Sequence, residues 1–219
     1  MRMLARRRWL RQAVGCTAGW AWAAYAQPQA AEARDFLSTR PSDEAQSLVA
    51  WVQRSGDARG RPFAVVDKRH ARIYVFGADG ALAGHSPALL GSTFGDHIVP
   101  GVGERAQTGA VRADERTTPA GRFEAKPGRN DKGEHVVWVD YESAFAIHRL
   151  RPGLAYSART TRLATSGVAD KRVSWGCVVV PVPFYTGVVQ RVLGAQRSVV
   201  YVMPEAGPLR AWLENVAAR

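Results

Sequence analysis

The sequence predicts a mainly β domain with short helices at its periphery. From Arg61 onward, apolar and polar residues alternate in several short runs, which is the period of half-buried strands. Turn-forming glycine, proline and aspartate separate these runs. A chain of 219 residues is of the right length for one such domain with an additional arm.

The first 26 residues are predicted to be a signal peptide. They contain five arginines and no acidic residue, continue into an apolar stretch, and end in Ala24-Tyr25-Ala26, a small-x-small cleavage pattern. The segment RRRWLR at 6–11 also resembles a twin-arginine signal. A lipidation box ending at Cys16 is a third reading, so the export route stays open. We expect an exported protein on the periplasmic or cell-wall side.

The charge of the mature chain favours an anionic partner. Removal of the five arginines in 1–26 lowers the formal net charge from +11 to +6. A basic exported protein suits the cell wall or a membrane surface. Nucleic acid is not expected as a partner, because the sequence has neither a basic helix nor a zinc-type spacing. No apolar run after residue 26 has the length of a membrane span.

The segment 27–60 is predicted to be a tether followed by a helix. Residues 27–40 show little periodicity. Ser42 is a typical N-cap, two acidic residues follow it, and the apolar residues after them are spaced as one helical stripe that ends before Gly56.

The remaining elements follow from local patterns. Strand-like runs lie at 62–68, 71–77, 81–92, 117–125, 135–141, 143–148 and 198–204. A short helix is expected at 183–194 and a C-terminal helix within 205–219. Residues 91–117 are rich in glycine and polar residues, so we expect a long loop or an irregular flap there. Residues 101–106 formally match a dinucleotide-binding fingerprint, but they follow Pro100 instead of a strand, and Gly109 interrupts the helix that should come next.

Cys177 is the one cysteine left after removal of the leader, so no intramolecular disulfide can form. A free thiol in an oxidising compartment is a liability unless it is buried or used. A nucleophilic cysteine needs a base, and all five histidines precede Cys177, an order that excludes papain-like folds. Neither a metal site nor another cofactor is expected, because the histidines and cysteines show no ligand spacing.

His148 is the strongest candidate for the base. It ends the apolar run AFAI just before a turn at 151–153, where a rigid strand end can present a side chain to a cleft. Gly176 beside the cysteine allows close approach of a substrate. The competing interpretation is structural: His148 as a buried or surface histidine, and Cys177 as a small apolar core residue.

Three motifs in order, TTPAGRF, AIH and SWGCVVV, resemble the L,D-transpeptidase catalytic domain of bacterial cell-wall enzymes. The matching positions are Thr118, Pro119, Gly121, Phe123, His148, Ser174, Gly176, Cys177 and Val178. The resemblance covers about residues 61–204 and implies a single curled β-sandwich with the cysteine at the end of a cleft.

The resemblance also implies a chemistry. Cys177 would be the nucleophile and His148 the general base, with Ser174 and the amides around Gly176 supporting the motif and the oxyanion. The substrate would be a peptidoglycan stem peptide. An acyl-thioester would form with release of a D-residue, and an amine of a neighbouring stem would then take the acyl group.

Two departures from the family pattern leave the acceptor open. Trp175 replaces the motif histidine and can donate only its indole N–H, so it is either a hydrophobic wall that contacts substrate or simple packing. Val179 stands where Asn or Arg is usual. Because of these changes, two alternatives to a transpeptidase stay open: a hydrolytic relative that uses water as acceptor, and a non-catalytic peptidoglycan-binding module.

The segment 149–173 between the two candidate catalytic residues is long enough to be a lid or to have structure of its own. It contains six basic residues and one acid, Asp170. Such a run is often a solvated face. Alternatively, some of these cations bind stem-peptide carboxylates, with Arg149 and Arg172 as the first choices because they lie closest to the pair.

Overall fold

The computed structural model describes residues 35–217. The expected signal peptide, 1–26, lies outside these residues, and the expected tether is described only from residue 35. Eight strands form one sheet in the order β3-β2-β1-β10-β5-β6-β7-β9. The strands are β1 (Phe63–Asp67), β2 (Arg72–Phe76), β3 (Leu82–Pro87), β5 (Gly121–Arg129), β6 (His135–Asp140), β7 (Phe145–Arg149), β9 (Val178–Val180) and β10 (Ser198–Val202).

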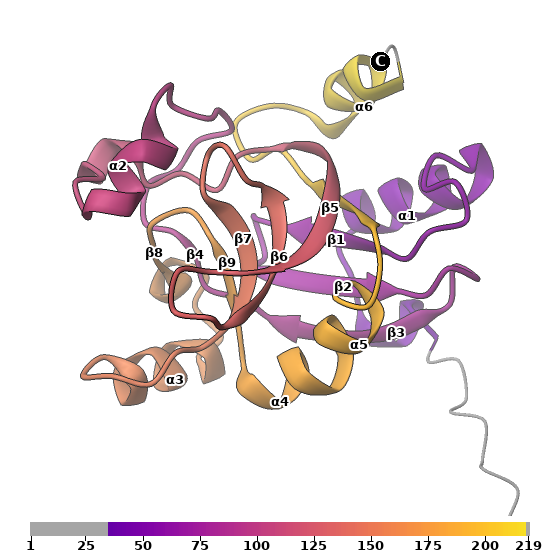
Figure 1. The fold of residues 1–219 in the computed structure, drawn as a ribbon. Helices are drawn as coiled ribbons and strands as arrows, with labels where there is room; N and C mark the ends of the chain where they lie inside the picture. The colour runs from indigo at the N-terminus through magenta and orange to yellow at the C-terminus, as the bar shows by residue number, and fades with distance from the viewer. Residues whose placement is uncertain (1–34, 218–219) are drawn as a thin grey trace, which may run out of the picture. The chain divides into compact units, whose positions relative to one another are not determined.

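The sheet curls until its two edges nearly meet (Figure 1). The long strand β5 makes this possible, because its first half pairs with β10 and its second half with β6. At the far edge, Leu89, just after β3, exchanges two backbone hydrogen bonds with Val179 of β9, at 2.8 and 2.9 Å. The structure thus confirms the predicted fold class, a mainly β, curled sandwich-like domain.

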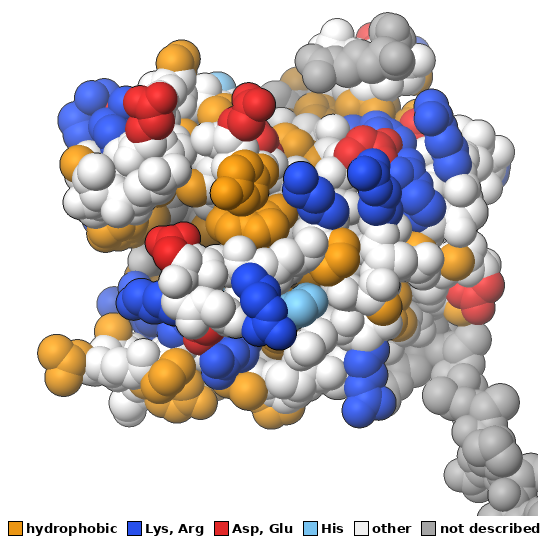
Figure 2. Space-filling view, viewed as in Figure 1, with side chains coloured by type: hydrophobic (Ala, Val, Ile, Leu, Met, Phe, Trp, Pro, Cys, Tyr) orange, Lys and Arg blue, Asp and Glu red, His pale blue; other side chains and the backbone are white. Residues whose placement is uncertain are grey.

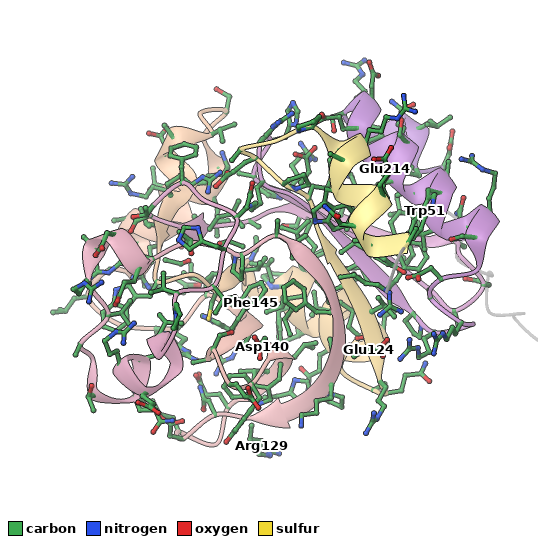
Figure 3. All side chains as sticks on the ribbon, turned by 90° about the horizontal axis from the view of Figure 1, so that it is seen from above. Trp51, Glu124, Arg129, Asp140, Phe145 and Glu214 are labelled. Atoms are coloured by element: carbon green, nitrogen blue, oxygen red, sulfur yellow. The ribbon has the colours of Figure 1, made fainter. Side chains whose placement is uncertain are left out.

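The main core fills the inside of the curl. Its buried side chains come from β1, β2, β5, β6, β7, β9 and β10, and Figure 3 shows Phe145 of β7 pointing into this interior. A helical segment made of α4 (Val182–Phe184), η4 (Tyr185–Val189) and α5 (Gln190–Val192) adds Tyr185, Val189 and Leu193 to the same core. It corresponds to the helix predicted at 183–194.

Two helices pack on the outside of the sheet. These are α1 (Asp43–Ser55) and α6 (Leu209–Ala217), and both contribute to a second apolar cluster over β1, β2 and β10. The start of α1 is as predicted: the Ser42 hydroxyl accepts a hydrogen bond from the Ala45 amide at 3.1 Å. Among the described residues, no helix has the length and apolar character needed to cross a membrane.

Several short elements lie where the sequence predicted loops. Helix α2 (Val102–Thr108) and the turn η2 (Ala113–Glu115) lie within the expected flap, and Gly109, expected to interrupt a helix, instead caps the end of α2. Segment 149–173 contains α3 (Tyr156–Ala164) and η3 (Ala169–Lys171), so it has structure of its own. The short strands β4 (Leu90–Gly91) and β8 (Arg172–Ser174) pair in parallel as a separate small sheet.

Candidate active site

Strands β7 and β9 bring His148 and Cys177 to the same face of the sheet. The two strands pair in parallel, with Ile147 opposite Val178 and His148 opposite Val179. Cys177 directly precedes β9 and packs with Val179, which places it on the face that carries His148. Cys177 lies two residues before Val179, the partner of His148 on the neighbouring strand. The spacing within and between parallel strands therefore puts the Cα atoms of His148 and Cys177 about 8 Å apart, a separation that two side chains can span.

The His148 ring is held in one orientation and is neutral. Its Nδ1 lies 2.8 Å from the Arg149 carbonyl oxygen, which can only accept, so Nδ1 carries the proton and Nε2 the lone pair. Burial, followed by the positive charge of Arg151, lowers the pKa of His148 to about 4. At neutral pH the resting ring is therefore unprotonated, and the same burial that keeps it neutral makes it a weaker base than a free imidazole.

The Cys177 thiol is protonated at rest. Its Sγ lies 3.5 Å from the Ala144 carbonyl oxygen, to which the thiol donates. Burial raises the pKa of Cys177, and neither the Ala146 backbone amide nor Arg151 cancels this effect. The resting pair is thus a thiol and a neutral imidazole, and the thiol must turn from Ala144 toward His148 before the proton can move.

The loop before the cysteine is fixed by Ser174. The Ser174 hydroxyl donates to the Cys177 carbonyl at 2.7 Å and accepts from the Gly176 amide at 3.1 Å. Gly176 has φ +126°, and a Cβ there would lie 2.7 Å from the Thr117 carbonyl oxygen. The Gly176 amide is thus used within the loop, by the Ser174 hydroxyl.

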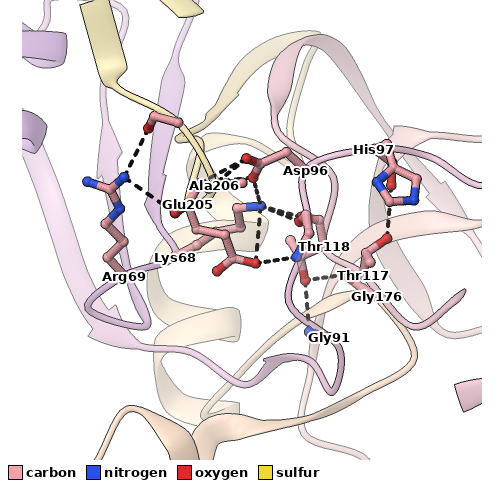
Figure 4. A network of polar contacts seen from close by, with 12 residues as sticks. Lys68, Arg69, Gly91, Asp96, His97, Thr117, Thr118, Gly176, Glu205 and Ala206 are labelled. Carbon is pink, nitrogen blue, oxygen red and sulfur yellow. Dashed lines mark hydrogen bonds and ion pairs between the residues drawn. The ribbon is translucent and has the colours of Figure 1, made fainter. Parts of the chain in front are cut away.

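Thr118 ties this loop to the rest of the molecule (Figure 4). Its hydroxyl donates to the Gly176 carbonyl and accepts from the Gly91 amide, both at 2.8 Å. The fully buried Lys68 donates in turn to the carbonyls of Thr118 and Gly95 and to the Asp96 carboxylate. Sequence reasoning missed Lys68, although a lysine that continues an apolar strand run is an available signal for a buried, paired cation.

A pocket lies beside Cys177. It is lined mainly by apolar side chains, from Ile98, Val99, Val102, Glu115, Thr117, Pro119, Ser143, Ala144, Phe145, Trp175, Gly176 and Cys177. His148 is outside this lining. The surface is indented between the regions of α2 and α3, with hydrophobic side chains at the edge (Figure 2).

On the side away from the pocket, segment 149–173 covers His148 and Cys177. Leu150 and Leu163 of this segment pack with Leu89 and Val179 in a small apolar cluster, against which Cys177 also lies. His148 is buried on this side. In the described structure the thiol is therefore reached from the pocket, while the imidazole stays shielded from solvent.

The three predicted substrate-contact residues lie in different settings. Trp175 is 46% exposed and lines the pocket. Arg149 forms an ion pair with Glu134 at 2.8 Å. Arg172 is buried, paired with Glu205, and donates to the Lys68 carbonyl at 3.0 Å. Neither arginine lines the pocket, and each forms an ion pair within the protein; a contact of either with substrate stays a prediction.

No group of three or more potential metal ligands from His, Cys, Asp and Glu occurs within residues 35–217. The glycine-rich fingerprint at 101–106 does not follow a strand, since β4 ends at Gly91 and α2 begins at Val102.

The buried neutral histidine makes a testable contribution to stability. The native pKa of about 4 lies below the ordinary value of 6.5, so on acidification the unfolded chain binds this proton first. Stability should fall by about 3 kcal/mol as the pH drops from about 6.5 to 4 because of this residue alone. Urea unfolding at several pH values should show a smaller loss for His148→Asn; an identical loss in both proteins would contradict the assignment.

Comparison with known proteins does not assign a family. No family model matches the chain, and no curated protein does. One solved structure, a fused Zn-dependent amidase/peptidase/peptidoglycan-binding domain-containing protein from Clostridium acetobutylicum ATCC 824, is similar at a TM-score of 0.36 and 13% identity. The match covers 74% of this chain and 62% of that one, and so less than two thirds of its length. A TM-score this low assigns no activity.

Proposed function

We propose that the chain is an exported cysteine acyltransferase of the L,D-transpeptidase type that acts on peptidoglycan stem peptides. The observation that carries the proposal is the parallel pairing of β7 and β9. By this register His148 and the residue opposite it, Val179, share a face of the sheet with Cys177, and Cys177 borders a pocket. The ordered motifs that resemble this family add the substrate class.

The first half-reaction follows from these atoms. Nε2 of His148 takes the thiol proton, and the Cys177 sulfur attacks the carbonyl carbon of the bond between an L-centre and a terminal D-residue. The Cys177 amide faces the tetrahedral oxyanion. The imidazolium then gives its proton to the leaving amine, the C–N bond breaks, and the D-amino acid leaves an acyl-thioester on Cys177.

The second half-reaction depends on the acceptor. An amine of another stem would attack the thioester carbon, His148 would take the amine proton, and the returning thiolate would recover it. The products are a cross-link and the free thiol. With water as acceptor, the same steps give a shortened peptide with a new carboxyl group.

Water is a second candidate acceptor for the acyl group, because one side of Cys177 is covered by apolar side chains. The pocket beside Cys177 is open on one side of the residue, while Leu150 and Leu163 cover the other side. An acyl chain bound in this pocket would share the open side of Cys177 with any incoming peptide. Transfer to a stem amine would therefore require displacement of α3.

Incubation with a purified disaccharide tetrapeptide, followed by mass spectrometry of the products, tests the proposal. A cross-linked dimer would indicate transfer, and a tripeptide monomer would indicate hydrolysis. Either product must disappear in Cys177→Ala. Folded protein that yields neither product but still binds sacculi would support the non-catalytic alternative instead.

A further inference from the structure

Several arginines near the pocket or the candidate catalytic residues form ion pairs with carboxylates. Arg105 and Arg112 both contact the buried Glu115, and Arg149 and Arg151 share Glu134. Arg172 is paired with Glu205. Arg116 differs from these: within residues 35–217, no carboxylate lies within ion-pair distance of its guanidinium.

Arg116 is nevertheless held in place. Its Nε and Nη2 donate to the Val111 carbonyl at 3.3 and 3.1 Å, and its Cζ lies 5.0 Å from the centre of the Trp175 ring. Nη1 makes no hydrogen bond to any described residue. The guanidinium is thus oriented by the protein and keeps donor capacity for a ligand.

Its position is at the rim of the pocket. Arg116 is not itself part of the lining, but its neighbours Glu115 and Thr117 are, and so is the Trp175 ring on which it stacks. Trp175 and Cys177 are two residues apart, so their Cα atoms are at most about 7 Å from each other. In a peptide, the terminal carboxylate lies about 4 Å beyond the carbonyl carbon of the preceding residue.

We propose that Arg116, stacked on Trp175, binds the free terminal carboxylate of the peptide whose preceding carbonyl carbon is attacked by Cys177. This inference rests on the proposed function and specifies its acyl donor as a peptide with an unmodified C-terminus. The apolar pocket offers such a group no other unpaired cation among the described residues. Charge-assisted donation from a guanidinium suits a carboxylate.

A pair of alkylating reagents measures the effect of this charge at the thiol. Iodoacetate carries a carboxylate and iodoacetamide does not, and both alkylate ionised thiols. We would measure the rates for Cys177 by peptide mass spectrometry at alkaline pH. Arg116→Gln should lower the iodoacetate-to-iodoacetamide rate ratio about fivefold, the scale of one partly exposed charge pair. Arg116→Lys should retain most of the ratio.

Arg197→Gln is the matched control, because it removes one charge from an exposed arginine whose segment lies outside the pocket lining. It should leave the ratio at the wild-type value. In the wild type, salt should lower the ratio as it screens the guanidinium, a measurement that needs no variant.

The outcomes separate the two proposals. Alkylation by both reagents with an unchanged ratio in Arg116→Gln would overturn the carboxylate assignment and leave the nucleophile intact. A Cys177 that neither reagent modifies until the protein is unfolded would contradict the proposed function, and this inference with it. With tetrapeptides, the preference in kcat/KM for a free C-terminus over its amide should fall by a similar factor in Arg116→Gln.

Discussion

Acylation of Cys177 should be at least about 10²-fold slower in His148→Asn than in the wild type. Asparagine can place an amide N–H near the position of Nδ1, so the hydrogen bond to the Arg149 carbonyl can be kept while the base at Nε2 is lost. The thiol, whose pKa is raised by burial, then has no internal acceptor for its proton. The rate of acyl-enzyme formation with a stem tetrapeptide, followed by rapid quench and intact mass, measures the effect.

His70→Asn is the matched control for this variant. His70 is more than half exposed, contacts Asp67, and lies outside the pocket lining. Its replacement should leave the acylation rate within about twofold of the wild type, as expected for a surface site. A His148→Asn protein that acylates as fast as this control would show that the imidazole is not the base.

The largest effect on stability should come from Lys68→Met. Lys68 is fully buried, and its ammonium group contacts Asp96, the carbonyls of Gly95 and Thr118, and, at 3.6 Å, Glu205. Methionine has a similar volume but leaves the two carboxylates and two carbonyls without this donor. Breaking one side of a buried ion pair costs about 3–5 kcal/mol. Urea unfolding of both proteins measures the difference.

Arg69→Met provides the comparison for Lys68. Arg69 is the next residue and also forms an ion pair, but its contact with Glu44 is more than one third exposed on both sides. This substitution should cost at most about 1 kcal/mol. If Lys68→Met lost no more stability than Arg69→Met, the buried network would not be the anchor that Figure 4 indicates.

Elements with local signals were predictable from the sequence. The cap at Ser42 and the stripe that follows it locate α1, and two-residue alternation locates the strands on either side of each turn. These features depend on side chains a few residues apart, and therefore a single sequence contains the information. The curl of the sheet came from the resemblance, since neither period nor composition encodes how a sheet closes.

Elements that depend on distant contacts were not predictable. Helix α2 contains Gly103, whose missing side chain is needed because a Cβ would lie 1.8 Å from the Glu142 carbonyl oxygen of another segment. Glycine has low helix propensity, so the local pattern favours a loop there. Strand β8 has three residues, and its partner β4 lies far earlier in the chain. No local pattern records such a pairing.

The same distinction applies to the site. Closeness in sequence to His148 and Cys177 suggested Arg149 and Arg172 as substrate contacts, and the fold adds that each is paired with a carboxylate from another part of the chain, Glu134 and Glu205. Arg116 precedes the TTPAGRF motif and was not singled out. Its stacking on Trp175 became visible only when the fold brought residues 116 and 175 together.

The central claim is that Cys177 becomes acylated by a stem peptide with loss of its terminal D-residue. Intact-mass analysis of the mature protein, quenched in acid during turnover of a tetrapeptide, tests this directly. We expect a mass increase equal to the acyl tripeptide, located on Cys177 by peptide mapping and removed by hydroxylamine. An unmodified Cys177 in folded protein that nevertheless processes the peptide would contradict it.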